Sequence, residues 1–237
     1  MEHSLGLLTV TAASLGFIHT LVGPDHYVPF TVISKARNWS FPKTMWITFL
    51  CGVGHILSSV VLGLIGIAFG IAVGKLEFIE SQRGEIAAWL LITFGLLYMV
   101  WGIQKAVQNK SHVHLHDHAE GEVHKHVHVH REDHAHLHTR KEEPNLTPWI
   151  LFTIFVFGPC EPLIPLIMYP AAKSSLAGVF WVAATFGGVT IVTMMTLVAL
   201  TRWGIQWLPL KFFERYMHAM AGGTILFCGL AIRFLGI

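Results

Sequence analysis

The chain has 237 residues, of which 53% are apolar and 13% charged, and its formal net charge is +2. A soluble domain carries roughly 25% charged residues, so this composition excludes an ordinary soluble protein and indicates an integral membrane protein. The lipid bilayer is the first expected partner, and the small net charge predicts no nucleic-acid partner. Three isolated cysteines do not form a disulfide framework: Cys51, Cys160 and Cys228.

A membrane helix needs about 20 mostly apolar residues, and the sequence predicts six such spans. Their approximate ranges are 5–33, 45–73, 86–103, 148–171, 176–200 and 217–235. A polar insert separates the third span from the fourth. The predicted organisation is therefore a first three-helix unit (1–104), an insert (105–146) and a second three-helix unit (147–237).

The first and fourth predicted spans each contain a Gly-Pro interruption followed by two side chains that can bind metal. Asp25 and His26 follow Gly23-Pro24, and Cys160 and Glu161 follow Gly158-Pro159. Proline removes a backbone donor and breaks a helix. Asp25 and Glu161 are also the acids that we place inside apolar segments, where an ionisable group is costly and indicates a functional site.

The two halves share further features that predict a repeat. His55 follows Asp25 by thirty residues, as Thr190 follows Cys160. Three spans per half is an odd number, so the second half would be inverted relative to the first, with broken helices facing each other near the midplane. The predicted fold is all-α, with six transmembrane helices as two inverted three-helix repeats whose first helices are broken. Coincidence in glycine-rich helices is the alternative.

Basic residues predict the orientation, because they concentrate in cytoplasmic loops. One side holds twelve, including six in the insert, and the other side holds four: Lys75, Arg83, Lys173 and Arg233. This asymmetry predicts a cytoplasmic insert and both termini outside. The expected location is the cytoplasmic (inner) membrane of a prokaryote.

The insert holds eleven of the sixteen histidines, mostly as His-x-His between His112 and His138. Neutral imidazole binds Zn, Cu, Ni and Co ions, and such tracts are typical of metal binding. A solvated polar linker is the alternative. The pattern favours a segment that gathers or senses ions.

Four histidines lie in or beside the spans: His19, His26, His55 and His218. On an intact helix His19 and His26 would be about 10 Å apart, too far to share one ion. The break at Gly23-Pro24 would allow His19, Asp25 and His26 to converge. We predict ligand roles for His19, Asp25, His26 and His55, with Cys160 and Glu161 as further candidates and His218 as a weaker one.

These residues resemble the signature of the nickel/cobalt transporter family. The stretch from His19 to the Asp25-His26 pair is similar to its first motif, and Gly54-His55 followed by Ser58 is similar to its second. The six spans with a histidine-rich loop look like the related efflux proteins. Here five residues, where that family usually has four, separate His from Asp-His. The uptake branch typically has eight spans, against six here. The resemblance implies passage of Ni or Co ions, with His19, Asp25, His26 and His55 as selectivity ligands.

A second resemblance concerns Gly158-Pro159-Cys160, which is similar to the Pro-Cys element of membrane thiol-reductant carriers of cytochrome biogenesis. Those proteins need a cysteine in each half, whereas Asp25 occupies the corresponding place here. Thiol exchange needs a second thiol.

None of the familiar catalytic motifs is present, so we expect no enzyme. The predicted function is transport of a divalent transition-metal ion, Ni or Co favoured and Zn or Cu possible, in a chain that could form a homo-oligomer; a thiol or electron carrier using Cys160 is the alternative.

Overall fold

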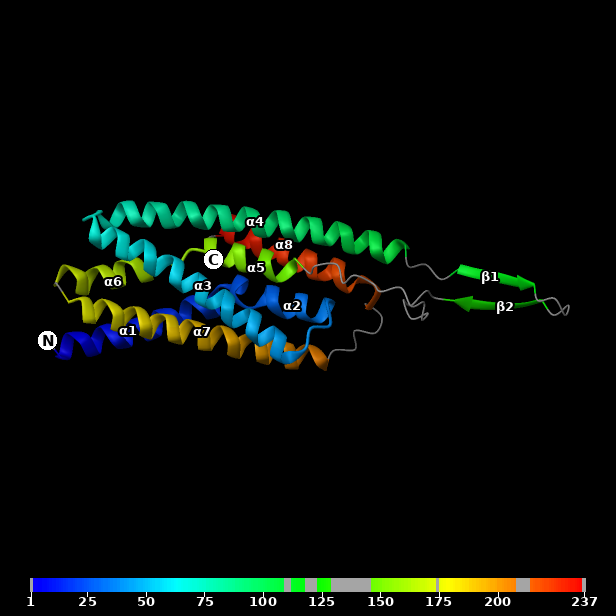
Figure 1. Cartoon of the computed structure of the whole chain (residues 1–237), viewed down its shortest axis with the longest axis horizontal. Coiled ribbons are helices and arrows are strands. Elements are labelled where there is room, and N and C mark those ends of the chain that lie inside the picture. Colours follow the sequence, from blue (N-terminus) through cyan, green and yellow to red (C-terminus); the bar gives the residue numbers. More distant parts are fainter. Residues whose placement is uncertain are drawn as a thin grey trace.

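A computed structural model describes residues 2–108, 112–117, 123–128, 146–173, 175–207 and 214–235 as an elongated helical bundle with a two-stranded ribbon at one end (Figure 1). The helices are α1 (Glu2–Val22), the short 3-10 helix η1 (Pro24–His26), α2 (Val28–Ala36), α3 (Phe41–Ala68), α4 (Val73–Gln108), α5 (Thr147–Phe157), α6 (Leu163–Ala172), α7 (Leu176–Gln206) and α8 (Met217–Leu235).

Five helices in the described residues are long and apolar enough to cross a membrane. They span Leu5–Val22, Phe41–Ala68, Val73–Gln108, Leu176–Ile205 and Glu214–Leu235. The predicted fourth span is instead two shorter apolar helices, α5 and α6, on either side of the second Gly-Pro break. The third span is longer than predicted, because α4 begins at Val73 rather than near Ile86.

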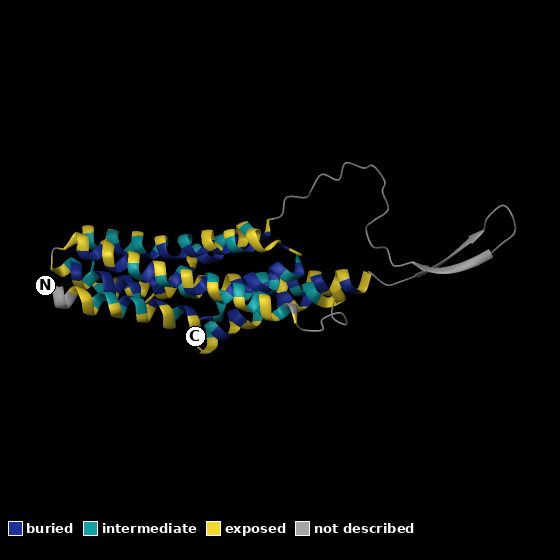
Figure 2. Ribbon diagram, turned by 90° about the horizontal axis from the view of Figure 1, so that it is seen from below, coloured by how far each residue is buried: buried dark blue, intermediate teal, exposed yellow. Residues whose placement is uncertain are grey.

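The outer surface of the bundle is strongly apolar. Figure 2 shows that exposed residues line the outward faces of the helices, with buried residues between them. Many of the exposed side chains are large and apolar, including Phe69 at 79% and Trp149 at 70% exposure. Soluble monomers rarely expose apolar patches larger than a few hundred Å², so this surface is the one expected of a protein that lies in lipid.

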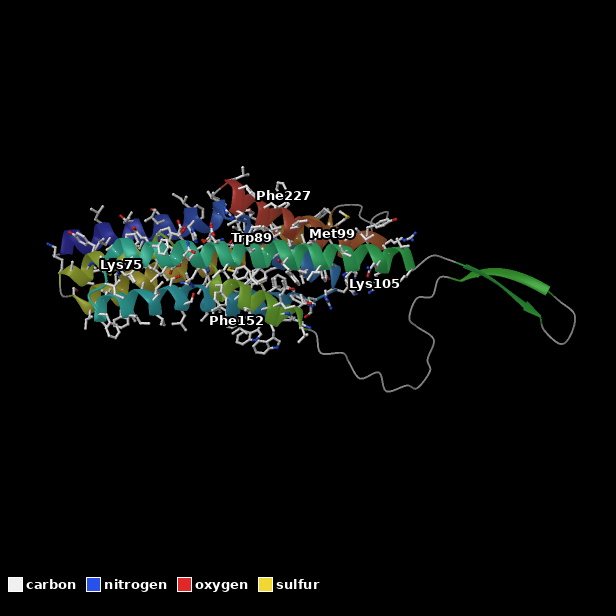
Figure 3. All side chains as sticks on the ribbon, turned by 90° about the horizontal axis from the view of Figure 1, so that it is seen from above. Lys75, Trp89, Met99, Lys105, Phe152 and Phe227 are labelled. Atoms are coloured by element: carbon white, nitrogen blue, oxygen red, sulfur yellow. The ribbon has the colours of Figure 1, made fainter. Side chains whose placement is uncertain are left out.

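Helix α4 runs along the bundle and packs against α8, while α1 packs against α7 and α3 against α5 and α7. Lys75 and Lys105 mark the two ends of α4 in Figure 3, with Trp89 and Met99 between them. Glycines permit the close approach of α4 and α8. A Cβ atom on Gly95 would collide with the backbone of Leu226, and one on Gly222 with the backbone of Met99.

Both Gly-Pro sequences interrupt their helices. Helix α1 ends at Val22, Gly23 adopts an extended conformation, and the chain makes one 3-10 turn before α2 begins. Helix α5 ends at Phe157, and α6 starts at Leu163. Pro24 and Pro159 cannot donate the backbone hydrogen bonds that would continue either helix.

The insert contributes an antiparallel pair of strands, β1 (His112–Asp117) and β2 (Val123–His128). The prediction of an all-α chain therefore holds for the bundle but not for these two segments. Their register pairs His112 with His128, His114 with His126 and His116 with His124. The side chains of the insert, on which its predicted metal binding depends, lie outside the described part of the structure.

Candidate metal centre

The first break brings together two histidines that an intact helix would separate. His19 lies in the last turn of α1, and His26 ends η1. Their ring centroids are 4.7 Å apart, whereas seven residues of continuous helix would place the residues about 10 Å apart. The Gly23-Pro24 interruption thus folds the chain so that both rings face one point.

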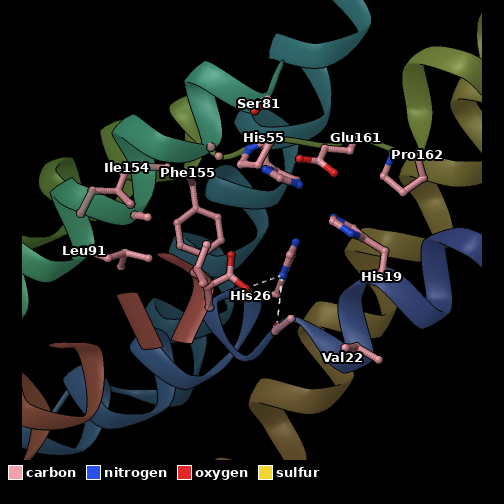
Figure 4. Close-up of a pocket in the computed structure, with 18 of the residues that line it drawn as sticks. His19, Val22, His26, His55, Ser81, Leu91, Ile154, Phe155, Glu161 and Pro162 are labelled. Carbon is pink, nitrogen blue, oxygen red and sulfur yellow. Dashed lines mark hydrogen bonds and ion pairs between the residues drawn. The ribbon is translucent and has the colours of Figure 1, made fainter. Parts of the chain in front are cut away.

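His55, which lies on α3, adds a third imidazole to this group. Its ring centroid lies 5.1 Å from that of His26 and 6.1 Å from that of His19. One nitrogen from each ring can be chosen so that all three lie within 4.8 Å of one another. Figure 4 shows the three rings around a common space, with His55 and His26 buried. We call His19, His26 and His55 the imidazole trio.

Four of the six ring nitrogens of the trio are buried without a well-formed hydrogen bond among the described residues. These are Nε2 of His19, Nε2 of His26 and both nitrogens of His55. A buried polar group without a partner costs free energy, so native proteins rarely leave one in this state. Because one nitrogen from each ring lies within 4.8 Å of the others, the three residues could hold a metal ion between them.

Asp25 lies beside the trio and orients one of its rings. Its Oδ1 is 3.1 Å from Nδ1 of His26, and the backbone oxygen of Gly23 is 3.2 Å from the same nitrogen. When Nδ1 carries the proton it donates to both oxygens, and the lone pair of Nε2 then faces the other two rings. Histidines that bind metals in proteins almost always make such a bond through the second nitrogen.

The trio borders a cavity of about 500 Å³. Arg233 also lines the cavity and pairs with Glu85 at 3.5 Å. The polar lining consists of His19, Asp25, His26, His55, Ser81, Glu85, Glu161 and Arg233. Phe155 forms an apolar wall, with its ring centroid 6.5 Å from that of His26 and 6.4 Å from that of His55. Glu161 points into the cavity on the side of His55 and His19 (Figure 4). The cavity therefore holds imidazole nitrogens and carboxylates together.

The remaining sequence candidates lie elsewhere. Cys160 is fully buried in an apolar cluster with Ala12, Ile56 and Leu163, and it is not among the residues grouped as possible metal ligands. His218 accepts or donates a 2.8 Å hydrogen bond with the hydroxyl of Tyr98 and packs edge-on against Trp101. The structure thus brings together His19, His26 and His55, places Asp25 and Glu161 beside them, and leaves Cys160 and His218 apart.

The sequence reasoning missed a buried ion pair. Glu80 is 0% exposed and lies 2.7 Å from Arg83 within α4. The sequence analysis gave this pair no role, because Glu80 lies in a charged stretch. Arg83 lies within α4 rather than in a loop, while the side of the membrane assigned to it stays a prediction. Buried residues recur at Leu76, Glu80, Ala87 and Leu91 with helical spacing, but the charged residues between them have the composition of a loop, so the sequence alone gave no signal that α4 extends through this stretch.

Comparison with known proteins gives no match, whether with family models, with curated proteins or with solved structures.

Proposed function

We propose that this chain is a transmembrane transporter of a divalent transition-metal ion, with nickel or cobalt favoured and zinc or copper as further candidates. The observation that carries the proposal is the imidazole trio, because its buried nitrogens converge without partners among the described residues. The trio lies at an interruption between α1 and α2, and broken helices are where many transporters bind their substrate.

The donor set supports a transition metal. Imidazole nitrogen suits Zn, Cu, Fe and Ni ions, whereas Mg and Ca prefer oxygen ligands. Nickel and cobalt are favoured by the resemblance of the segments around His19, Asp25, His26 and His55 to the nickel/cobalt transporter family. Asp25 and Glu161 border the same cavity, and their carboxylates would offset the charge of the ion.

The spacing of the trio supports a site that closes around an ion. A metal–nitrogen bond is about 2.0–2.1 Å long, so three nitrogens that bind one ion lie at most about 3.6 Å from one another. The trio nitrogens lie within 4.8 Å of one another. The rings therefore need to move together by about an ångström to bind one ion at this bond length.

The proposed architecture is six spans in two inverted repeats, with α5 and α6 crossing as one broken unit, both termini outside and the insert in the cytoplasm. Reciprocal contacts between α4 and α8 support the repeat. Gly95 faces Gly222, Gly102 faces Ala219, and Gly229 faces Ile92. Gly95 and Gly102 are seven residues apart, as are Gly222 and Gly229, so the two helices exchange equivalent positions as a two-fold axis requires. Rocking of the halves would then expose the trio to each side in turn.

A thiol carrier is the weaker reading. Cys160 is packed among apolar side chains, and all three cysteines, Cys51, Cys160 and Cys228, are free and buried. Thiol–disulfide exchange needs a second thiol within reach, and no observation brings one to Cys160.

The proposal is tested by metal accumulation in cells that express the wild-type chain or single His19→Ala, His26→Ala and His55→Ala variants, with nickel, cobalt, zinc, copper and manganese measured in parallel. His218→Ala is the matched control, because it removes an imidazole of the same bundle that lies away from the trio. We expect the wild type to change cellular nickel or cobalt in one direction, and each trio variant to abolish that change.

Equal membrane levels of all variants must be established by immunoblot. If His26→Ala and His55→Ala leave the flux of every metal as in the wild type, the trio is not the transport site. If the wild type alters no metal, but Cys160→Ser abolishes delivery of reducing equivalents across the membrane, the thiol carrier replaces the present proposal.

A further inference from the structure

The second break contacts an ion pair from the opposite half of the chain. Glu80 and Arg83 lie on α4, whereas the break runs from Gly158 to Pro162. Glu80 is 0% exposed and Arg83 is 15% exposed in its side chain. Leaving two charges in the interior of an apolar bundle is costly unless further hydrogen bonds satisfy them.

Arg83 satisfies the open end of α5. Its Nη2 donates to the backbone oxygens of Val156, at 2.8 Å, and Gly158, at 3.4 Å. Val156 lies in the last turn of α5 and Gly158 is the residue that caps it, where no following helical turn supplies an N–H. A cation also favours the negative end of the helix dipole. The guanidinium thus takes the place of the helical turn that the break removes.

The same guanidinium reaches α3 directly beside the trio. Arg83 Nη2 donates to Ser58 Oγ at 2.6 Å, and Nη1 donates to Ser59 Oγ at 3.3 Å. Ser58 Oγ in turn donates to the backbone oxygen of His55 at 2.8 Å. One side chain therefore connects the helix that carries His55 with the end of α5.

Glu80 holds the other side of the break. Its Oε2 accepts the backbone N–H of Cys160 at 3.3 Å, while its Oε1 pairs with Arg83. Cys160 lies just ahead of α6 and directly before Glu161, whose side chain faces the cavity. The carboxylate therefore fixes the backbone from which Glu161 projects. A Cβ atom on Gly158 would lie 3.1 Å from His55 Nδ1, so the held backbone passes close to the trio.

The first break has a different support. At Gly23, the backbone oxygen contacts the ring of His26, and His26 pairs with Asp25, so this break is held by the residues that line the cavity. The two breaks thus differ: one is held by its own cavity residues, and the other by a cation and an anion from α4.

We propose that Glu80 and Arg83 are positioning residues that hold the second break against His55, and so keep Glu161 in the cavity beside the trio. The statement about Glu161 and the trio rests on the proposed transport function. The clamp itself does not, because it is defined by contacts that involve no metal.

The test measures how fast N-ethylmaleimide labels each native cysteine in isolated membranes containing the full chain, with peptide mass spectrometry to resolve the three sites. Cys160 lies in the break, whereas Cys51 and Cys228 lie in α3 and α8; all three are buried. In Glu80→Gln and in Arg83→Lys the break loses buried hydrogen bonds to a charged group, so it should open more often and expose Cys160. We therefore expect Cys160 to be labelled about tenfold faster or more. Cys51 and Cys228 should keep their wild-type rates.

Glu77→Gln is the matched control, since Glu77 is an exposed acid one turn from Glu80 on the same helix, and it should label like the wild type. Arg83→Lys retains the positive charge beside Glu80, and it provides the test if Glu80→Gln does not accumulate. Unchanged labelling of Cys160 in Arg83→Lys would overturn the proposal. So would a parallel rise at all three cysteines, because that result means general loosening of the bundle. Since no metal enters the assay, its failure is distinct from failure of the transport proposal.

Discussion

The three imidazoles differ in how firmly their neighbours hold them. His26 is held at Nδ1 by two acceptors, Asp25 and the backbone oxygen of Gly23. His55 lies near the backbone of Phe155, but neither of its nitrogens makes a well-formed hydrogen bond among the described residues. His19 is half-buried at the end of α1. We infer that His26 is the fixed ligand, toward which the other two rings move when the ion binds.

This difference predicts the effect of changing Asp25. Asp25→Ala removes the acceptor that selects the His26 tautomer, and loss of such a partner typically costs 10–100-fold in metal affinity. We expect the metal concentration for half-maximal transport to rise by about that factor, with a smaller rise in Asp25→Asn, whose amide oxygen still accepts from Nδ1. Transport rate measured against nickel or cobalt concentration checks this. Wild-type affinity in Asp25→Ala would contradict the orienting role.

The convergence of His19 and His26 could be predicted from the sequence, because both have a distinct local signal. Histidines in apolar segments are rare, and the Gly-Pro sequence between His19 and His26 predicts an interruption of the helix. Glu80 and Arg83 gave no such signal, because Lys75, Glu77 and Glu85 surround them and the whole stretch has the composition of a loop. Glu80 is buried, and Arg83 largely so, only because α4 packs against the second break.

The ends of the helices could be predicted better from the positions of the prolines than from the lengths of the apolar segments. Both interruptions could be predicted, since Pro24 and Pro159 each follow a glycine within an apolar segment. The start of α4 could not, because a charged stretch reads as solvent-exposed unless its burial is known. Packing between α4 and α8 depends instead on glycines. The sequence around a glycine does not show that the backbone of another helix lies against it.

Two adjacent glycines of α8 provide a matched test of that packing. A Cβ on Gly222 would collide with the backbone of Met99, whereas one on Gly223 meets only the Met99 sulfur, at 3.6 Å. Overpacking typically costs 1–3 kcal/mol, while alanine favours a helix over glycine by about 1 kcal/mol. We therefore expect Gly222→Ala to lower the thermal unfolding temperature in detergent, and Gly223→Ala to leave it equal or raise it.

Equal unfolding temperatures for the two variants would show that α4 and α8 do not approach as closely as described. The comparison is informative because both substitutions add the same methyl group to the same helix, one residue apart. General effects of alanine on helix formation or on detergent binding therefore cancel between them.

Across the whole molecule, the trio and the insert are separate along the chain and in space. The trio lies within the bundle, whereas the strands of the insert project beyond one end of it (Figure 1). Helix α4 is 36 residues long, or about 54 Å at 1.5 Å per residue, well beyond a hydrocarbon core of about 30 Å. A helix of this length extends beyond the hydrocarbon core at one end or at both.

This separation predicts that the insert tunes transport without being required for it. Replacing residues 112–138 by a Gly/Ser segment of equal length should leave maximal flux intact and raise the half-maximal metal concentration roughly tenfold, because tethered ligands raise the local concentration of ion. The companion variant changes only the eleven insert histidines to Asn, and it should show the same rise, which assigns the effect to imidazole rather than to length. Metal flux across a concentration series measures both. Loss of all flux would mean that the trio cannot act alone, and wild-type curves for both variants would remove the insert from the transport mechanism.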